Sequence, residues 1–241
     1  MSDDWSPNTD WNERLWRYFR PERFSQALRE STLYFASAPQ FPDKFEGASA
    51  VMAPDFPVDP RFTEMDMMER VNYDFRQFHK ISCWHRSEHE NMAMWQIYAS
   101  EHKGVAITST AERLRQSYKP YRIKPTYGTE DLWAGPVEYK DLTQIRLSSR
   151  GRQRYFCKHL PFYWEREFRL LISLESASDL GVMTPDNGVL VEFDFNAMVE
   201  SIMVGPGLTS DEIEMVRKEA IEAGLGDRIK KSSFFGRPRF I

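Results

Sequence analysis

Two glutamates separated by a single residue, Glu165 and Glu167, lie in the most distinctive stretch of the chain, KHLPFYWEREFRLLISLE at residues 158–175. As an extended strand, this stretch places both glutamates and Arg169 on one face, because strand side chains alternate with period two. Two carboxylates at this spacing can share acid–base work or stabilise a cation. They can equally form a structural ion pair with Arg169 or a nearby lysine, and the residues alone favour this second interpretation.

Arg17 is a candidate for binding an anionic group. It alternates with aromatic residues, including Tyr18, in a predicted strand over residues 15–19. A guanidinium there can bind a diphosphate through two parallel hydrogen bonds, or it can pair with Glu165 or Glu167. The sequence contains no G-x-G-x-x-G, Walker A or G-x-S-x-G pattern. It therefore argues against a Rossmann enzyme, a P-loop enzyme and an α/β-hydrolase.

A helix predicted over residues 91–102 carries two aromatic side chains that could bind a planar ligand. Trp95 and Tyr98 could stack on nicotinamide or on a base. Alternatively, Met92, Trp95 and Ala99 form the buried face of the helix, as an apolar stripe at helical spacing usually does. The interior is favoured for Trp95, and both interpretations stay open for Tyr98.

The segment HRSEH, residues 85–89, matches the H-x-x-E-H pattern of some zinc peptidases. His85 and His89 could bind one zinc together, with Glu88 beside them, only if the segment were helical. The pattern instead follows a predicted strand and reads as a loop or a helix entry. We therefore expect a chance match and no metal.

Composition limits the class of protein. The chain has 241 residues, 41% of them hydrophobic, and 32 basic against 36 acidic residues give a net charge of −4. Such a balance argues against a general nucleic-acid-binding protein. Two cysteines are too few for a disulfide framework. With no signal peptide and no apolar run of about 20 residues, we expect a cytoplasmic protein without membrane association.

Short, numerous strands with helices between some of them predict an α+β fold, with a mixed, mostly antiparallel sheet and flanking helices. We expect an N-terminal arm over residues 1–13, which Trp5 and Trp11 predict to dock, and one α+β domain over 14–241. A segment near residues 48–78 resembles an insertion, and its second half predicts an amphipathic helix.

The predicted elements follow from alternation, helical spacing and turn residues. Two capping boxes are predicted, one from Ser109 and Glu112 and one from Thr209 and Glu212. The predicted strands cover residues 15–19, 33–36, 81–84, 104–108, 121–127, 136–140, 158–175, 189–195 and 201–205. The predicted helices cover residues 22–31, 91–102, 109–118 and 210–224.

Several boxes, in chain order, resemble a bacterial family known as domain of unknown function 2971. The third box departs from the family pattern, because Pro42 and Lys44 replace an asparagine and a proline. The family name implies no activity. The matching boxes are LWRYF at 15–19, TLYFASAP at 32–39, FPDKFE at 41–46, SCWH at 82–85, the Met-Trp-x-x-Tyr-Ala box at 94–104, and Lys158 with WEREFR at 164–169.

The order of these elements also resembles the layout of ADP-ribosyltransferases. This resemblance implies NAD as the cosubstrate, with Arg17 holding the NAD ribose and Tyr98 stacking on the nicotinamide. It implies Glu167 as the catalytic carboxylate that stabilises an oxocarbenium ion, and Glu165 as the base on the acceptor side. The implied catalytic residues are Tyr98, Glu165 and Glu167, and the implied cofactor-binding residues are Arg17, Tyr18, Asp43, Glu46, Trp95, Lys158 and Arg169.

The resemblance implies an enzyme that acts on NAD and an unknown acceptor, either protein or nucleic acid, within a bacterial defence or toxin system. Two alternatives of other classes stay open. The same residues could form a buried polar network in a non-catalytic, ligand-sensing module. The carboxylates Asp43, Glu46, Glu165 and Glu167, with Lys158, could also serve a metal-dependent nuclease or hydrolase.

Overall fold

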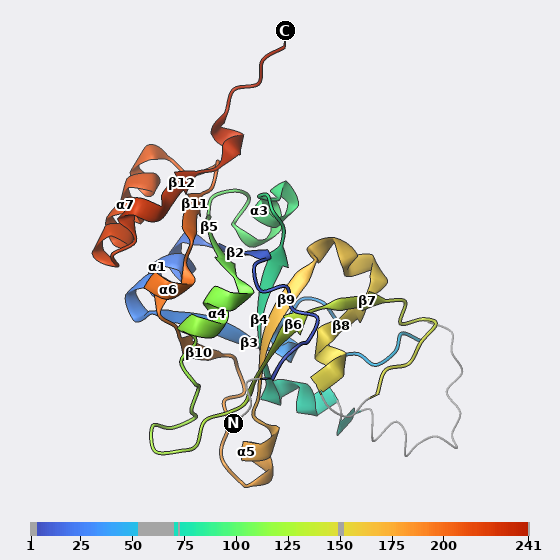
Figure 1. The fold of residues 1–241 in the computed structure, drawn as a ribbon. Helices are drawn as coiled ribbons and strands as arrows, with labels where there is room; N and C mark the ends of the chain where they lie inside the picture. The colour runs from blue at the N-terminus through green and yellow to red at the C-terminus, as the bar shows by residue number, and fades with distance from the viewer. Residues whose placement is uncertain (1–3, 53–69, 72, 149–151, 241) are drawn as a thin grey trace. The chain divides into compact units, whose positions relative to one another are not determined.

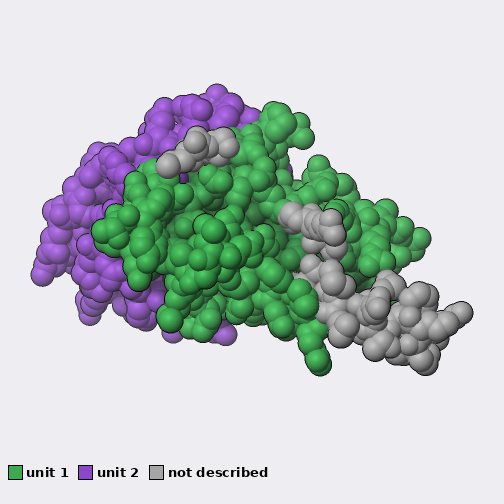
Figure 2. Space-filling model, turned by 90° about the horizontal axis from the view of Figure 1, so that it is seen from below, with its two compact units in different colours: residues 1–8, 34–83, 120–190 green, residues 9–33, 84–119, 191–241 purple. Residues whose placement is uncertain are grey.

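The structure is a computed structural model, and its described residues form two compact units built from interleaved segments. Unit 1 comprises residues 1–8, 34–83 and 120–190, and unit 2 comprises residues 9–33, 84–119 and 191–241 (Figure 2). The insertion predicted near residues 48–78, with its amphipathic helix, lies largely outside the described residues. The structure describes residues 4–52, 70–71, 73–148 and 152–240.

Unit 1 is built on a sheet in which the strands follow the order β1–β6–β9–β4–β3 (Figure 1). β1 pairs with β6 in parallel, whereas β6 with β9 and β3 with β4 pair in antiparallel fashion. A second, two-stranded sheet pairs β7 and β8 in parallel. The strands are β1 (Asp4–Trp5), β3 (Thr32–Ser37), β4 (His79–Arg86), β6 (Leu132–Pro136), β7 (Glu138–Lys140), β8 (Cys157–His159), β9 (Glu167–Ser173) and β10 (Val189–Glu192).

Short helices connect the strands of unit 1, and most of them have 3₁₀ geometry. β3 enters the unit at Tyr34, and β4 leaves it after Cys83. The helices are η1 (Ala38–Gln40), η3 (Phe75–Phe78), η4 (Arg152–Phe156), η5 (Leu160–Glu165) and α5 (Glu175–Asp179).

Unit 2 contains the sheet order β4–β2–β5–β11–β12. β2 pairs with β4 and β5 in antiparallel fashion, as β5 does with β11, whereas β11 and β12 run parallel. Its elements are β2 (Arg14–Phe19), α1 (Pro21–Glu30), α3 (Met92–Tyr98), β5 (Val105–Thr110), α4 (Ala111–Ser117), α6 (Phe195–Met198), β11 (Ser201–Val204), α7 (Ser210–Glu222), η6 (Gly226–Arg228), β12 (Ile229–Lys231) and η7 (Ser233–Phe235).

The hydrophobic core of each unit follows from the spacing of apolar side chains along its strands and helices. In unit 1, β9 is apolar on both faces over residues 170–172, and these side chains are fully buried. A continuous apolar run is what a strand covered on both faces requires. In unit 2, α1 buries Phe24, Ala27 and Leu28 on one stripe, and it stops at Ser31, which adopts a left-handed conformation. Each large apolar side chain buried in this way contributes about 1.5–3 kcal/mol.

Outside the stretch at residues 158–175, three local predictions are wrong. The cap of α4 is Thr110, whose hydroxyl accepts from Arg113 N–H, because Ser109 still belongs to β5. Residues 121–127 form bends and one turn rather than a strand, as the proline within them makes a ladder strand unfavourable. In α3, Met92 is 42% exposed, since the helix turns Met94 inward instead.

Most of the architecture agrees with the sequence. The mixed, mostly antiparallel sheet with flanking helices is confirmed. The capping box of α7 is also confirmed, because Thr209 Oγ1 accepts from Glu212 N–H while Glu212 accepts from Thr209 N–H. Within the described ranges, no helix combines the length and the apolar character needed to cross a membrane.

Candidate functional site

The stretch that the sequence predicts as one strand, residues 158–175, is broken into three pieces, so that prediction is wrong. β8 ends at His159, the 3₁₀ helix η5 follows, and β9 begins only at Glu167. A proline in the first turn of η5 favours the helix start, because its φ is already helical. Between η5 and β9, Arg166 adopts the left-handed conformation with φ 43° and ψ 55°.

Three-residue periodicity in η5, rather than strand alternation, positions Glu165. Side chains three apart lie in one row of a 3₁₀ helix. Phe162 and Glu165 form the row that faces Lys158, whose Nζ lies 4.7 Å from the Phe162 ring centroid and 2.5 Å from Glu165 Oε2. Leu160 and Tyr163 form an exposed row. The left-handed residue that follows then lets Glu167 approach the same lysine from β9.

A buried charge cluster in unit 1 has two halves, and Lys158 is the centre of the half that we call outer. Its Nζ lies 2.5 Å from Glu165 Oε2, 3.0 Å from Glu167 Oε1 and 3.6 Å from Asp43 Oδ2. All four side chains are less than a tenth exposed. One ammonium therefore holds three carboxylates together in a poorly solvated site, where charge interactions are strong.

Arg169 is the centre of the other, inner half of the charge cluster. Its Nε donates to Glu167 Oε2 at 2.6 Å, and its two terminal nitrogens bind the Glu46 carboxylate at 2.6 and 2.8 Å. A further bond reaches the Tyr155 carbonyl oxygen. Glu46 and Arg169 are fully buried. Such two-pronged pairing fixes both partners, so Glu167 is held between Lys158 and Arg169.

Neighbouring residues support the cluster without carrying charge. Gly47 has φ +71°, and a side chain there would place Cβ 2.7 Å from the Tyr155 ring, so only glycine fits. The backbone N–H of Glu167 donates to the Tyr139 hydroxyl at 2.7 Å. Sequence reasoning missed these residues. Gly47, directly after Glu46, could have indicated a constrained backbone next to that carboxylate, whereas nothing in the sequence connects Tyr139 to the site.

The two glutamates are driven to opposite protonation behaviour. Burial and the adjacent Glu167 carboxylate raise the pKa of Glu165 to about 7. Burial also acts to raise the pKa of Glu167, but the Arg169 and Lys158 charges outweigh it and hold that pKa well below its ordinary value. Near neutral pH the pair thus carries one proton-exchanging carboxyl and one permanent carboxylate. Such a division marks acid–base sites.

The surroundings of Cys83 disfavour the reactive form of its thiol. The residue lies in β4, the neighbour of β9 in unit 1. Burial and the Glu167 carboxylate raise the pKa of Cys83 well above its ordinary value. Because the thiolate is the reactive form, the proton stays on the sulfur at neutral pH.

In unit 2, Tyr18 and Trp95 lie in the interior. The Trp95 ring is fully buried, it meets Tyr18 edge-on with 5.0 Å between ring centroids, and its Nε1 donates to Glu90 at 3.0 Å. The Tyr18 hydroxyl accepts from Asn91 N–H at 3.1 Å, and burial raises its pKa above the ordinary value. Trp95 therefore packs as a core residue, and no face of its ring is open to a ligand.

Arg17 and Tyr98 are the accessible candidates of unit 2. The Arg17 guanidinium carbon lies 5.5 Å from the Phe19 ring centroid and 5.8 Å from that of Trp84. Tyr98 exposes 42% of its surface at the end of α3.

The structure brings six of the ten predicted site residues together within unit 1, namely Asp43, Glu46, Lys158, Glu165, Glu167 and Arg169.

The HRSEH segment does not form the helical zinc motif. His85 lies buried in β4, which ends at Arg86, and His89 is exposed beyond it. The helical spacing that would join the two histidines is therefore missing. In the part of the chain that the structure describes, no three histidine, cysteine, aspartate or glutamate side chains gather in a way that could hold a metal ion.

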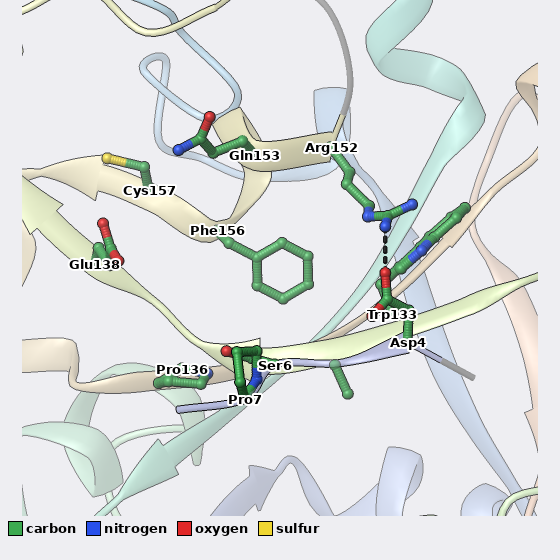
Figure 3. A pocket seen from close by; sticks show the side chains of 11 residues that line it. Asp4, Ser6, Pro7, Trp133, Pro136, Glu138, Arg152, Gln153, Phe156 and Cys157 are labelled. Carbon is green, nitrogen blue, oxygen red and sulfur yellow. Dashed lines mark hydrogen bonds and ion pairs between the residues drawn. The ribbon is translucent and has the colours of Figure 1, made fainter. Parts of the chain in front are cut away.

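A cavity of about 240 Å³ in unit 1 lies apart from the charge cluster, and none of the six clustered residues lines it (Figure 3). The N-terminal residues close one side of it, because β1 pairs with β6 and Arg152 forms an ion pair with Asp4. The Arg152 guanidinium also stacks 4.3 Å from the Trp133 ring centroid. The cavity is lined by Asp4, Ser6, Pro7, Trp133, Ala134, Pro136, Glu138, Arg152, Gln153, Phe156 and Cys157.

No protein-family model matches the chain, and neither does any curated protein. Membership of domain of unknown function 2971 therefore stays a prediction. Among solved structures, the chain is similar to Thermus sp. 2.9 DarT. For the complex with NAD+, the TM-score is 0.39 at 10% identity, covering 91% of this chain and 94% of that one.

Two further structures of the same protein are similar to this chain. For the complex with ADP-ribosylated ssDNA, the TM-score is 0.38 at 10% identity, with 96% and 97% of the two chains covered. For the complex with carba-NAD+, the TM-score is 0.35 at 11% identity, with 94% and 96% covered. At TM-scores this low the likeness carries no argument about function, which has to be inferred from the site itself.

Proposed function

We propose that the protein is an ADP-ribosyltransferase-like enzyme that transfers the ADP-ribosyl group of NAD and releases nicotinamide. One observation carries the proposal. Glu165 and Glu167 share Lys158, yet burial raises the pKa of Glu165 to about 7 while Arg169 and Lys158 hold that of Glu167 well below its ordinary value. Glycosyl transfer needs both a permanent negative charge and a group that accepts a proton near neutral pH.

The proposed step is a substitution at the ribose carbon. The bond between C1′ and the nicotinamide nitrogen breaks, and both of its electrons leave with neutral nicotinamide. The Glu167 carboxylate stabilises the positive charge that develops on the ribose. A hydroxyl or amine of the acceptor, or water, then bonds to C1′ and gives its proton to Glu165.

The proposal assigns NAD binding to residues that the resemblance implies. The roles implied for Arg17, holding the NAD ribose, and for Tyr98, stacking on the nicotinamide ring, fall on residues of unit 2 and stay predictions. Tyr98 suits stacking better than Trp95, because Tyr98 exposes 42% of its surface whereas Trp95 is fully buried. Lys158 would orient the two carboxylates, since it contacts both. The acceptor is a protein or a nucleic acid.

The test measures nicotinamide release from NAD by the purified full chain, with water as the acceptor, in the presence and absence of a chelator. The Glu167→Gln variant should lose about a thousandfold, the scale of a transition-state electrostatic contact. The Glu165→Gln variant should lose about a hundredfold, the scale of a general base. Glu22→Gln, an exposed carboxylate on α1, is the matched control and should behave as wild type.

Folding of each variant is followed by circular dichroism and thermal unfolding, because both glutamates are buried. A folded Glu167→Gln protein with wild-type release would contradict the proposal. So would absence of release together with absence of NAD binding by calorimetry. Release that the chelator abolishes would instead favour the metal-dependent hydrolase.

A non-catalytic binding module is the second candidate, and one observation favours it. Both carboxylate oxygens of Glu167 are already bound, Oε1 by Lys158 and Oε2 by Arg169. A purely structural network would show the same saturation. This candidate predicts that Glu167→Gln lowers thermal stability while leaving ligand binding intact, which the same set of variants distinguishes.

A further inference from the structure

The solvent-facing side of helix α7 in unit 2, called its outer face below, carries both acidic and apolar side chains. Met215 and Ile221 expose 62% and 60% of their surfaces there. Both side chains line one open hollow, so this face has an apolar part that a partner could cover. The residues that line this open hollow are Asp211, Glu214, Met215, Lys218, Ile221 and Glu222.

Two acidic residues at the ends of this face have no cationic partner in the part of the chain that the structure describes. α7 carries five acidic and two basic residues. The helix's other carboxylates are occupied: Glu212 caps it, Glu214 approaches Arg217 and Glu219 accepts from Ser25. Within the described residues, no cation pairs with Asp211 or Glu222, and both are exposed.

The segment 228–240 of the same unit has the complementary character. It contains five basic residues and no acidic one. Three phenylalanines are interleaved with them: Phe234, Phe235 and Phe240 are 42%, 38% and 96% exposed. No ion pair involving Arg237 or Arg239 is found among the residues that the structure covers.

A carboxylate fixes where this segment leaves unit 2. Glu90 accepts from the Ser232 hydroxyl at 2.6 Å, from Ser233 N–H at 2.6 Å and from the Ser233 hydroxyl at 2.5 Å. These bonds, together with the one that Trp95 Nε1 donates, lower the pKa of Glu90 even though burial opposes the shift, so Glu90 stays ionised. From this anchor, residues 236–240 lead away from α7 of their own chain (Figure 1).

We propose that residues 234–240 of one copy of the chain bind the outer face of α7 on a second copy. Arg237 and Arg239 would pair with Asp211 and Glu222, and the phenylalanines would cover Met215 and Ile221. Arg237 and Arg239 lie about 7 Å apart along an extended segment, whereas Asp211 and Glu222 lie about 16 Å apart along the helix, so the two long guanidinium side chains would splay outward to reach both carboxylates. The whole segment, residues 234–240, spans about 20 Å when extended.

A reciprocal exchange, in which each copy gives its segment to the other, closes the assembly as a two-fold dimer. One short segment per contact buries little surface, so the dimer should be weak, with a Kd on the order of micromolar. Because the charges sit at an exposed rim, association should weaken as salt rises.

The test is analytical ultracentrifugation of the full chain over a wide range of concentrations, at low and high salt. Wild type should dimerise in a concentration- and salt-dependent manner. Two charge-reversed variants should each be monomeric: the segment variant Arg237→Glu/Arg239→Glu, and the helix variant Asp211→Lys/Glu222→Lys. Like charges would face each other in both.

Mixing the two monomeric variants gives the sharpest readout. The negative segment of the first fits the positive helix of the second, and the positive segment of the second fits the negative helix of the first. A heterodimer should therefore form on mixing. The matched control is Glu22→Lys/Glu192→Lys, two exposed acidic residues elsewhere in unit 2, which should dimerise as wild type does.

Three results would overturn the proposal. They are a wild-type chain that stays monomeric at every concentration, dimers that survive both reversals, and variants that stay monomeric when mixed. Docking of the segment on its own helix would give the first result, with protection of residues 234–240 from protease at low concentration. Circular dichroism confirms that each variant is folded, which is expected because all four reversed residues are exposed.

Discussion

Two buried lysines of unit 1, Lys158 and Lys80, occupy opposite kinds of site. Lys158 faces the carboxylates of Glu165, Glu167 and Asp43. Among the described residues, the Lys80 ammonium donates hydrogen bonds only to uncharged oxygens, since its Nζ lies 2.6–2.7 Å from the Ser37 hydroxyl and from the carbonyl oxygens of Gln77, Pro185 and Asn187.

The surroundings decide what each lysine can do. Burial lowers the pKa of Lys80 to about 8, and the Asp186 charge offsets only part of this effect. Burial acts in the same direction on Lys158, but the carboxylates outweigh it and raise its pKa above the ordinary value. Lys80 ties the loop at residues 185–187 to the sheet. Lys158 instead balances charges whose protonation can change, which is the property that a reaction requires.

The largest effect is expected from removing the cation of the charge cluster. Lys158→Met would leave buried carboxylates without a counter-charge, so it should destabilise the protein by about 3–5 kcal/mol. Urea unfolding measures the loss. Lys140→Met, which removes an exposed lysine paired with Glu138, should cost at most about 1 kcal/mol. Adding Glu165→Gln should recover part of the stability, and no recovery would contradict the charge-balance explanation.

Removing the other lysine should cost less. Lys80→Met leaves three carbonyl oxygens and a hydroxyl without their donor, and an unsatisfied buried group costs about 1–3 kcal/mol. We expect a loss of about 2 kcal/mol in urea unfolding, together with faster amide exchange near residues 185–187. Equal losses for Lys80→Met and Lys158→Met would remove the distinction between the two sites.

A pH profile tests the proton-exchanging role of Glu165. Since burial and Glu167 raise the pKa of Glu165 to about 7, the basic form disappears as the pH falls below that value. Nicotinamide release should therefore rise with pH and level off above 7. Below it, release should drop about tenfold per pH unit, equivalent to about 1.4 kcal/mol. Glu165→Gln should give a low, flat profile, and an unchanged profile would assign the titration to another group.

The smallest effect concerns the backbone that brings the two glutamates together. Arg166 adopts a left-handed conformation that favours glycine. Arg166→Gly should relieve that strain and raise the free energy of unfolding slightly, by about 0.5–1 kcal/mol, which thermal unfolding measures. Arg166→Val should lower it, because a β-branched residue fits this conformation least. The reverse order would show that the Arg166 side chain itself stabilises the turn.

Much of the fold could be predicted from local pattern. Alternation in LWRYF predicts the strand at 15–19, and the Thr209–Glu212 capping box predicts the start of α7, because both signals depend on neighbouring residues only. The pairing of Glu167 with Arg169 was also accessible, since two residues in one strand with a single residue between them share a face.

The charge cluster as a whole was decided by tertiary structure. Glu46 lies 123 residues from Arg169 in sequence, and only the approach of its loop to β9 makes the pair. The strand pattern placed Glu165 beside Glu167 for the wrong reason, because a 3₁₀ helix and one left-handed residue bring it there. Burial acts to raise both pKa values, and the charges of Arg169 and Lys158 then separate the two chemically identical side chains by holding the pKa of Glu167 low. The sequence by itself therefore determined which residues could react, whereas only the packed structure decided which of them carries the proton.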